Sequence, residues 1–236
     1  GAGFGVFKTT DGGANWSASS NGMVGHDSQA LVVDPVMPSI LYSGSSLGSV
    51  FKSIDGGQNW TAIKTDACDV RSLAVDPVTH TTVYLGTNGC GLFKSTNSGA
   101  TWGTVTIASN VNTIAALAID PSAPTVIYAT GDLQQTINTY TPPTSVYKSV
   151  NGGSSWMQVN LGLPYAYLYS IAIDPVITST LYIGTASGVY KSIDSASIWA
   201  PANMGLINYV YTVSIDPVSP TTVYVGARDG VYASSY

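Results

Sequence analysis

Residues 53–60 read Ser-Ile-Asp-Gly-Gly-Gln-Asn-Trp, and variants of this motif recur along the whole chain of 236 residues. We call it the tryptophan motif. Aligning its copies on their last residue gives a repeat of about 42 to 54 residues. A period of this size is typical of propeller blades, each of which holds four strands. The tryptophans that end the five copies are Trp16, Trp60, Trp102, Trp156 and Trp199.

Two further motifs keep the same register. An Asp-Pro pair follows an apolar alternation such as Leu-Val-Val or Ile-Ala-Ile, and an aromatic residue followed by Lys precedes all five tryptophan motifs. Short alternating runs bounded by Gly, Pro and Asp indicate strands and turns. The Asp-Pro pairs begin at Asp34, Asp76, Asp120, Asp174 and Asp216. We therefore predict an all-β fold, a β-propeller of four-stranded antiparallel blades with about five blades in this chain.

The repeat predicts a single propeller domain over residues 1–236. A partial blade is expected at 1–20, full blades at about 29–63, 70–106, 113–159 and 169–200, and a last partial blade at 210–236. This gives one strand more than a closed ring of five four-stranded blades needs. The surplus strand would be a tail, would mark a fragment of a larger ring, or would be donated to another copy of the chain.

The conserved positions of the tryptophan motif have a structural explanation. Short Ser, Thr, Asp and Asn side chains hydrogen-bond to backbone groups within a tight loop, and Gly supplies a positive φ. The indole is expected to bury an apolar face against a neighbouring sheet while its N–H finds a partner. We predict this structural role for Asp11, Trp16, Asp55, Trp60, Asn97, Trp102, Asn151, Trp156, Asp194 and Trp199.

With these motifs, the chain resembles the BNR or Asp-box repeat family over its whole length. That family includes sialidases, sortilin-type receptors, family 74 xyloglucanases and photosystem II assembly factors, so the resemblance implies a propeller but no single function. A sialidase of this kind would need an arginine cluster and a Tyr–Glu pair. The chain has Arg71 and Arg228 as its only arginines and no Glu, which excludes sialidase activity.

Composition limits the partners. Only 9% of the residues are charged, and the formal net charge is -5 with eight basic residues, so we expect no nucleic-acid partner. No apolar run approaches the roughly 20 residues of a membrane span, so we expect no membrane insertion. We expect no cofactor, and no metal site, because His26 and His80 are the only histidines and fall on opposite faces of the predicted blades.

The irregular residues gather in the loops that enter the first strand of a blade or join its second and third strands. Variable loops on a rigid scaffold commonly carry function, so a protein or glycan would bind there. The alternative is that these loops vary because nothing constrains them and that half of the tyrosines fill gaps between blades. The binding candidates are Tyr165, Tyr167, Tyr209, Tyr140, Asp69, Asp132, Arg71 and Arg228.

Cys68 and Cys90 fall at the same edge of one predicted blade, before its first and third strands. Two strand spacings are too wide for a disulfide, but both residues lie in loops that could fold toward each other, and we predict a disulfide between them. A disulfide favours an extracellular or cell-surface location, and we expect a bacterial protein.

These features predict a non-catalytic propeller that acts as a surface binding or structural assembly module and self-associates, as an oligomer or filament, through its surplus edge strand. The alternative is a fragment of a glycoside hydrolase acting on plant-type glucans. Such an enzyme needs two carboxyl groups that flank the scissile bond, and Asp69 and Asp132 are the candidates.

Overall fold

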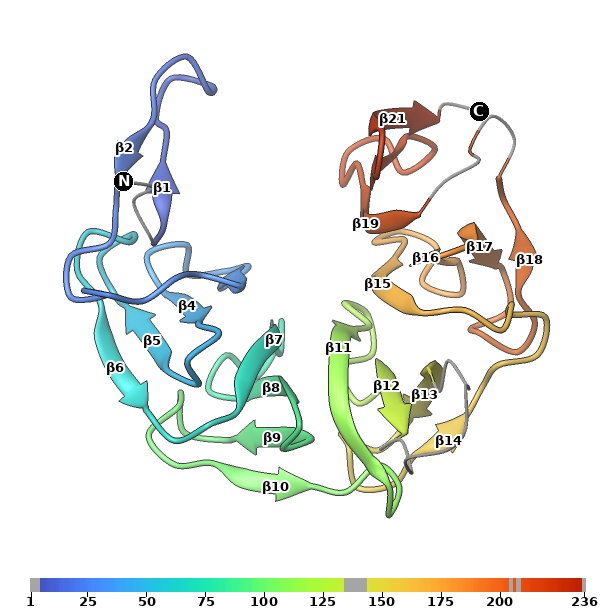
Figure 1. Ribbon diagram of the computed structural model, residues 1–236, viewed down its shortest axis with the longest axis horizontal. Helices are drawn as coiled ribbons and strands as arrows, with labels where there is room; N and C mark the ends of the chain where they lie inside the picture. The colour runs from blue at the N-terminus through green and yellow to red at the C-terminus, as the bar shows by residue number, and fades with distance from the viewer. Residues whose placement is uncertain (1–4, 134–143, 204–205, 207–208, 235–236) are drawn as a thin grey trace. The chain divides into compact units, whose positions relative to one another are not determined.

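The computed structural model describes residues 5–133, 144–203, 206 and 209–234, and these residues form 21 strands and no helix (Figure 1). The predicted all-β fold is confirmed. The chain divides into two compact units, residues 1–104 (unit 1) and 105–236 (unit 2). That the two units form a single domain, as the repeat indicates, stays a prediction.

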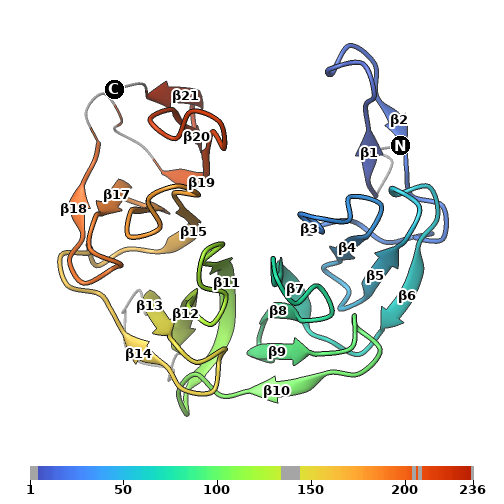
Figure 2. The same ribbon diagram turned by 180° about the vertical axis from the view of Figure 1, so that it is seen from behind.

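Unit 1 contains a two-stranded hairpin followed by two antiparallel blades, each with its strands in sequence order (Figure 2). The hairpin is β1 (Phe7–Lys8) and β2 (Ser17–Ala18). The first blade is β3 (Ala30–Val33), β4 (Leu41–Gly44), β5 (Val50–Ser53) and β6 (Thr61–Lys64). The second is β7 (Asp69–Val75), β8 (Val83–Asn88), β9 (Leu92–Ser95) and β10 (Gly103–Val105), whose last residue crosses the boundary between the units.

Unit 2 contains two full blades and a three-stranded sheet. The first blade is β11 (Val111–Ile119), β12 (Ile127–Leu133), β13 (Thr144–Ser149) and β14 (Met157–Gln158). The second is β15 (Leu168–Ile173), β16 (Leu181–Thr185), β17 (Gly188–Ser192) and β18 (Ala200–Pro201). The last sheet is β19 (Val210–Ile215), β20 (Val223–Ala227) and β21 (Gly230–Ser234). Strands β11, β15 and β19, the first of each group, are neighbours in space.

Each tryptophan motif forms the loop between the third and fourth strands of its blade. In the copy at 53–60, Asp55 Oδ1 accepts hydrogen bonds from the Ser53 hydroxyl and the Asn59 backbone N–H, and Oδ2 accepts one from the Asn59 side chain. Gly56 and Gly57 both have positive φ, at 72° and 88°. In the copy that ends at Trp199, the same two positions carry Ser195 and Ala196, which keep positive φ. The loop conformation therefore persists where the glycines are lost.

The Asp-Pro turns are also closed by side chains. Asp34 is buried, and its Oδ1 accepts hydrogen bonds from the backbone N–H groups of Val36 and Met37. The same pattern recurs at Asp76, Asp120, Asp174 and Asp216. These carboxylates are thus used in turn formation.

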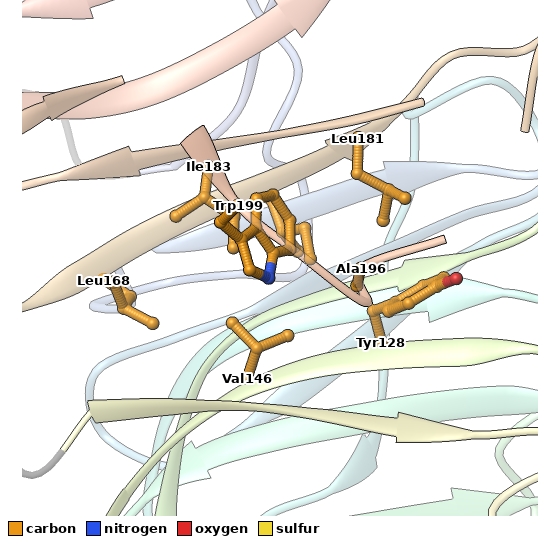
Figure 3. Close-up of a cluster of buried hydrophobic side chains, with 8 residues drawn as sticks. Tyr128, Val146, Leu168, Leu181, Ile183, Ala196 and Trp199 are labelled. Atoms are coloured by element: carbon orange, nitrogen blue, oxygen red, sulfur yellow. The ribbon is translucent and has the colours of Figure 1, made fainter. Parts of the chain in front are cut away.

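The tryptophans join consecutive blades. Trp199 is 2% exposed and packs among Tyr128 and Val146 of the preceding blade and Leu181 and Ile183 of its own (Figure 3). Its Nε1 donates a hydrogen bond of 2.9 Å to the Val159 carbonyl. Fully burying an aromatic side chain of this size is worth about 3 kcal/mol or more.

Two tryptophans depart from the expected burial and pairing. Trp16 is 62% exposed, because β1 and β2 pair only with each other and no further sheet covers the indole. The Nε1 of Trp102 is buried without a hydrogen-bond partner among the described residues. The expectation that every motif indole is buried and paired is therefore wrong for these two.

A second contact between consecutive blades uses a tyrosine and a lysine. In the first blade of unit 1, Lys52 lies over the ring of Tyr42, and both donate hydrogen bonds to the carbonyl of Ser98 in the next tryptophan motif. Tyr128 and Lys148 make the same pair of bonds to the carbonyl of Ser195 in unit 2. The apolar cores of these two blades are thus closed at the edge by the same polar contact.

Cys68 and Cys90 are joined by a disulfide, with their Cα atoms 5.6 Å apart. The bond links the loop before β7 to the loop before β9, at one edge of the blade. The two cysteines are closer than the strands β7 and β9 themselves, which are separated by β8, because the loops that carry them fold toward each other.

Candidate functional site

In every blade that the structure describes, two variable positions lie at or just before the start of the first strand. Counted back from the Asp-Pro pair, they are the seventh and the fifth residues. In unit 2 both positions are tyrosines at two successive strands. They are Tyr167 and Tyr169 at the start of β15, and Tyr209 and Tyr211 at the start of β19. We call these four residues the tyrosine ladder.

The ladder is a continuous row of rings. Tyr167 and Tyr169 are stacked with ring centroids 6.4 Å apart, and Tyr209 and Tyr211 are stacked at the same distance. The row is joined across the two strands by Tyr169 and Tyr211, whose centroids are 5.2 Å apart at a tilt of 54°. Buried Leu168 alternates with the tyrosines and anchors its strand in the core, so the rings are held by a packed backbone.

The ladder is accessible. Tyr167, Tyr209 and Tyr211 are between 40% and 49% exposed, and Tyr165, just before the ladder, is 66% exposed. The carbonyl of Tyr167 accepts a hydrogen bond from Ala186, so the backbone beneath the rings is fixed by the adjacent loop. A row of aromatic faces held on two strands suits stacking against flat apolar faces of a ligand, with the phenol hydroxyls available for hydrogen bonds.

Asp132 lies near this row. It pairs across strands with Thr113, which has the same repeat position in β11 that Tyr167 has in β15, and β12 contacts β15. Its Oδ1 is buried without a hydrogen-bond partner among the described residues. Burial raises the pKa of Asp132 above its ordinary value, and the nearby hydroxyl of Thr144 opposes part of this effect.

The charge of Asp132 reaches the ladder. Burial raises the pKa of Tyr169, and the neighbouring tyrosines and Asp132 act in the same direction. The phenol of Tyr169 is therefore neutral at any physiological pH and can donate a hydrogen bond. The site combines a row of aromatic faces, the neutral hydroxyl of Tyr169 and one desolvated carboxyl group.

In unit 1 the same two positions are polar. Before β3 they are Asp27 and Gln29, whose side chains are hydrogen-bonded at 2.6 Å. At the start of β7 they are Asp69 and Arg71, which form an ion pair of 2.5 Å. The further hydrogen bonds of these two aspartates stay within the same blade: Asp27 also accepts from the backbone N–H of Ser46, and Asp69 accepts from the side chain of Asn88.

The sequence-predicted candidates thus divide between the units. Tyr167, Tyr209 and Asp132 belong to the site in unit 2, with Tyr165 close by, while Asp69 and Arg71 pair with each other in unit 1. Arg228 is exposed, and its backbone N–H donates to the Tyr209 carbonyl. Tyr140 lies outside the described residues.

Sequence reasoning missed Tyr169 and Tyr211, the two central rings. The signal was present, since each lies two residues after a predicted tyrosine and both have the same position in the repeat.

The part of the chain that the structure describes contains no group of three or more His, Cys, Asp or Glu residues that could hold a metal ion. Within the same residues, no helix is long and apolar enough to cross a membrane.

No family model and no curated protein sequence matches the chain. Solved structures match in fold. An ancestral GH74 enzyme has a TM-score of 0.73 and 25% identity over 92% of this chain, and the Niastella koreensis GH74 enzyme has 0.66 and 26% over 84%. The GH74 xyloglucanase from Xanthomonas campestris has 0.71 and 17% over 88%.

These neighbours are much longer than the chain, which covers 31%, 33% and 36% of their respective lengths. Their likeness confirms the predicted propeller fold. It does not identify this chain with the Asp-box repeat family that its motifs resemble.

Proposed function

We propose that the chain is a carbohydrate-binding propeller module whose tyrosine ladder stacks against the sugar rings of a polysaccharide. The observation that carries this proposal is the continuous row of four tyrosine rings, of which three are at least 40% exposed. Sugar rings present flat apolar C–H faces, and tyrosine offers an apolar face with a polar edge. A protein partner would use the same residues, and it is the outcome to expect if no glycan binds.

The likeness to GH74 enzymes supports a carbohydrate, and one of them is a xyloglucanase. We therefore choose a plant-type glucan, xyloglucan, as the first ligand. The disulfide between Cys68 and Cys90 supports an extracellular or cell-surface location, where such polymers occur and disulfides persist. A bacterial source fits this proposal.

The test is binding to xyloglucan by isothermal titration calorimetry, with cellulose and mixed-linkage glucan as comparison ligands. Replacing Tyr169 and Tyr211 with Ala removes the centre of the ladder and should weaken binding at least about fivefold, since two aromatic contacts are each worth about 0.5–1.5 kcal/mol. Gln29→Ala with Arg71→Ala changes the same repeat positions in unit 1 and should leave the affinity unchanged. Equal losses in both variants, or no loss in either, would contradict the proposal.

A second candidate function is hydrolysis of the same polymer. Asp132 favours it, because a desolvated carboxyl group with a raised pKa beside a sugar-binding surface is suited to act as a general acid. Release of reducing sugar from xyloglucan, abolished by Asp132→Asn, would support hydrolysis. Binding without release would leave the non-catalytic proposal.

A further inference from the structure

Unit 2 contains a pocket of about 320 Å³ between the blade β15–β18 and the sheet β19–β21. Its apolar walls come from Tyr182 and Val189 of the blade and from Val223 and Val225 of the sheet, and Leu206 lies at one side. The pocket is away from the tyrosine ladder residues, none of which lines it. Its function is therefore separate from the proposed function.

In the preceding blade the same positions hold an indole. By the repeat, the four wall residues correspond to Tyr128, Val146, Leu181 and Ile183, which surround Trp199 (Figure 3). In unit 1 the corresponding Val6 and Leu41 contact Trp60. The pocket has the lining of a tryptophan site and holds no tryptophan among the described residues.

The hydrogen-bond acceptor for an indole is also present. In the two filled sites, the indole N–H donates to the carbonyl of a residue whose own N–H donates to a second backbone carbonyl. Trp199 donates to the carbonyl of Val159, and the N–H of Val159 donates to Val146. In the same way, Trp60 donates to the carbonyl of Ser19, and the N–H of Ser19 donates to Val6. Ala202 lines the pocket and has the same position, since its N–H donates to Val189. Its carbonyl is thus the expected partner of an indole N–H.

Beside the pocket there is also no tryptophan-motif loop, among the described residues, to accept a hydrogen bond from the lysine. Lys8, Lys52 and Lys148 each donate to a carbonyl in the following tryptophan motif, at 3.0, 3.4 and 2.9 Å. The equivalent Lys191 lies over the Tyr182 ring and makes no such bond among the described residues. A tryptophan motif that filled the pocket would supply this carbonyl.

The β1–β2 hairpin of unit 1 carries a motif with these properties. Its indole, Trp16, is 62% exposed, while Asp11 already accepts the hydrogen bonds from Thr9 and Asn15 that shape the loop. The loop is therefore formed, and its tryptophan has no blade to pack against in unit 1.

Lys8 of the hairpin and Tyr224 of the last sheet also match the lysine–tyrosine contact that the other blades contain. Tyr42, Tyr84, Tyr128 and Tyr182 each lie beneath a lysine of the next strand. Tyr224 of β20 pairs instead with Ala233 of β21 and is 44% exposed. In β1, Lys8 has the strand position that Ala233 has in β21. All five residues of β21 are exposed, and a strand that replaced it would have to take over its antiparallel pairing with β20.

We propose that, in the 236-residue chain, the pocket binds the β1–β2 hairpin of a second copy of this chain. Trp16 enters the pocket and donates to the carbonyl of Ala202, and β1 replaces β21 beside β20, so that Lys8 covers Tyr224. The carbonyl of Gly12, which has the position of Gly56 and Ser195 in their motifs, accepts from Lys191. The contact is head to tail and extends into oligomers.

The test uses two full-length variants that each disable one partner. Trp16→Ala removes the donated indole, and Ala202→Trp fills the pocket from an exposed position. By light scattering over a concentration series, the unmodified chain should form species above its 24.4 kDa monomer mass, and each variant should associate at least about thirtyfold more weakly, the loss expected for an interface hot spot. An equimolar mixture should form a dimer, because the pocket of one variant and the hairpin of the other are intact.

Thermal unfolding should show that both variants remain folded, since neither residue is part of the core. A monomeric unmodified chain at all concentrations would overturn the proposal, and so would a Trp16→Ala variant that associates normally. A mixture that stays monomeric would also overturn it, because docking between copies requires complementation. None of these outcomes depends on glycan binding.

Discussion

Two repeat positions at the start of a blade's first strand are polar in both blades of unit 1 and are tyrosines at β15 and β19 of unit 2. In unit 1, Asp69 forms an ion pair with Arg71 in its own strand and accepts a hydrogen bond from Asn88 of the adjacent strand, so its side-chain interactions stay within one blade. In unit 2, Tyr169 contacts Tyr211 of the next first strand, and the row continues. These side chains have the same positions in the repeat. The difference is that the polar pair interacts within one blade, whereas the tyrosines form a surface that continues from one blade to the next.

The largest effect is expected from exchanging these side chains. Tyr167→Asp with Tyr169→Arg transfers the unit 1 pair to β15 and interrupts the ladder, so the affinity for xyloglucan should fall below detection. The melting temperature should change little, because the pair already occurs at this position in β7. Calorimetry and thermal unfolding measure the two quantities, and retained binding would show that the ladder is not the binding surface.

Replacing Asp132 and replacing Asp69 are expected to change the stability of the protein in opposite directions, with a smaller effect than the exchange of the ladder residues. The raised pKa of Asp132 means that its charged form is disfavoured in the folded protein, so its stability contribution is greatest below the unfolded pKa near 3.8 and is lost as the pH rises through the folded pKa. Asp132→Asn should therefore raise the melting temperature at pH 7 and not at pH 3. Asp69→Asn should instead lower stability by up to about 1 kcal/mol, because it breaks a partly exposed ion pair. The same sign for both variants at pH 7 would contradict this difference.

The smallest effect concerns the tryptophan motif itself. In unit 1, Asp55 accepts from the Asn59 side chain, whereas in unit 2 the Asn151 side chain donates to the Ser155 hydroxyl. Asp55→Asn should lower the melting temperature by about 2–4 °C, and adding Asn59→Thr should recover most of the loss by restoring a matched donor and acceptor. A recovered melting temperature in the double variant would support the prediction. If the losses of the two single variants simply added in the double variant, positions 55 and 59 would not interact.

This motif also gives unit 1 a pH dependence. Hydrogen bonds from Asn59 and Ser53 lower the pKa of Asp55 to about 2. Its stabilising contribution is therefore present above the unfolded pKa near 3.8 and lost as the pH falls toward 2. The doubly substituted chain, with Asp55→Asn and Asn59→Thr, should have a shallower decline in melting temperature over that range.

The sequence alone determined the strands and their order. The tryptophan motif and the Asp-Pro pair recur at blade spacing, and both are closed by hydrogen bonds within a few residues, as at Asp55 and Asp34. Interactions of this kind depend on local spacing, which a single sequence displays. The prediction of an all-β propeller followed directly from them.

Only the tertiary structure decided which side chains meet between strands that are distant in sequence. It joined Tyr169 to Tyr211, left Trp16 exposed while burying Trp199, and formed a pocket whose lining repeats that of a tryptophan site. The physical reason is that each blade completes its core with groups from its neighbour. A repeat therefore specifies its own turns, while its contacts depend on what the adjacent blade presents.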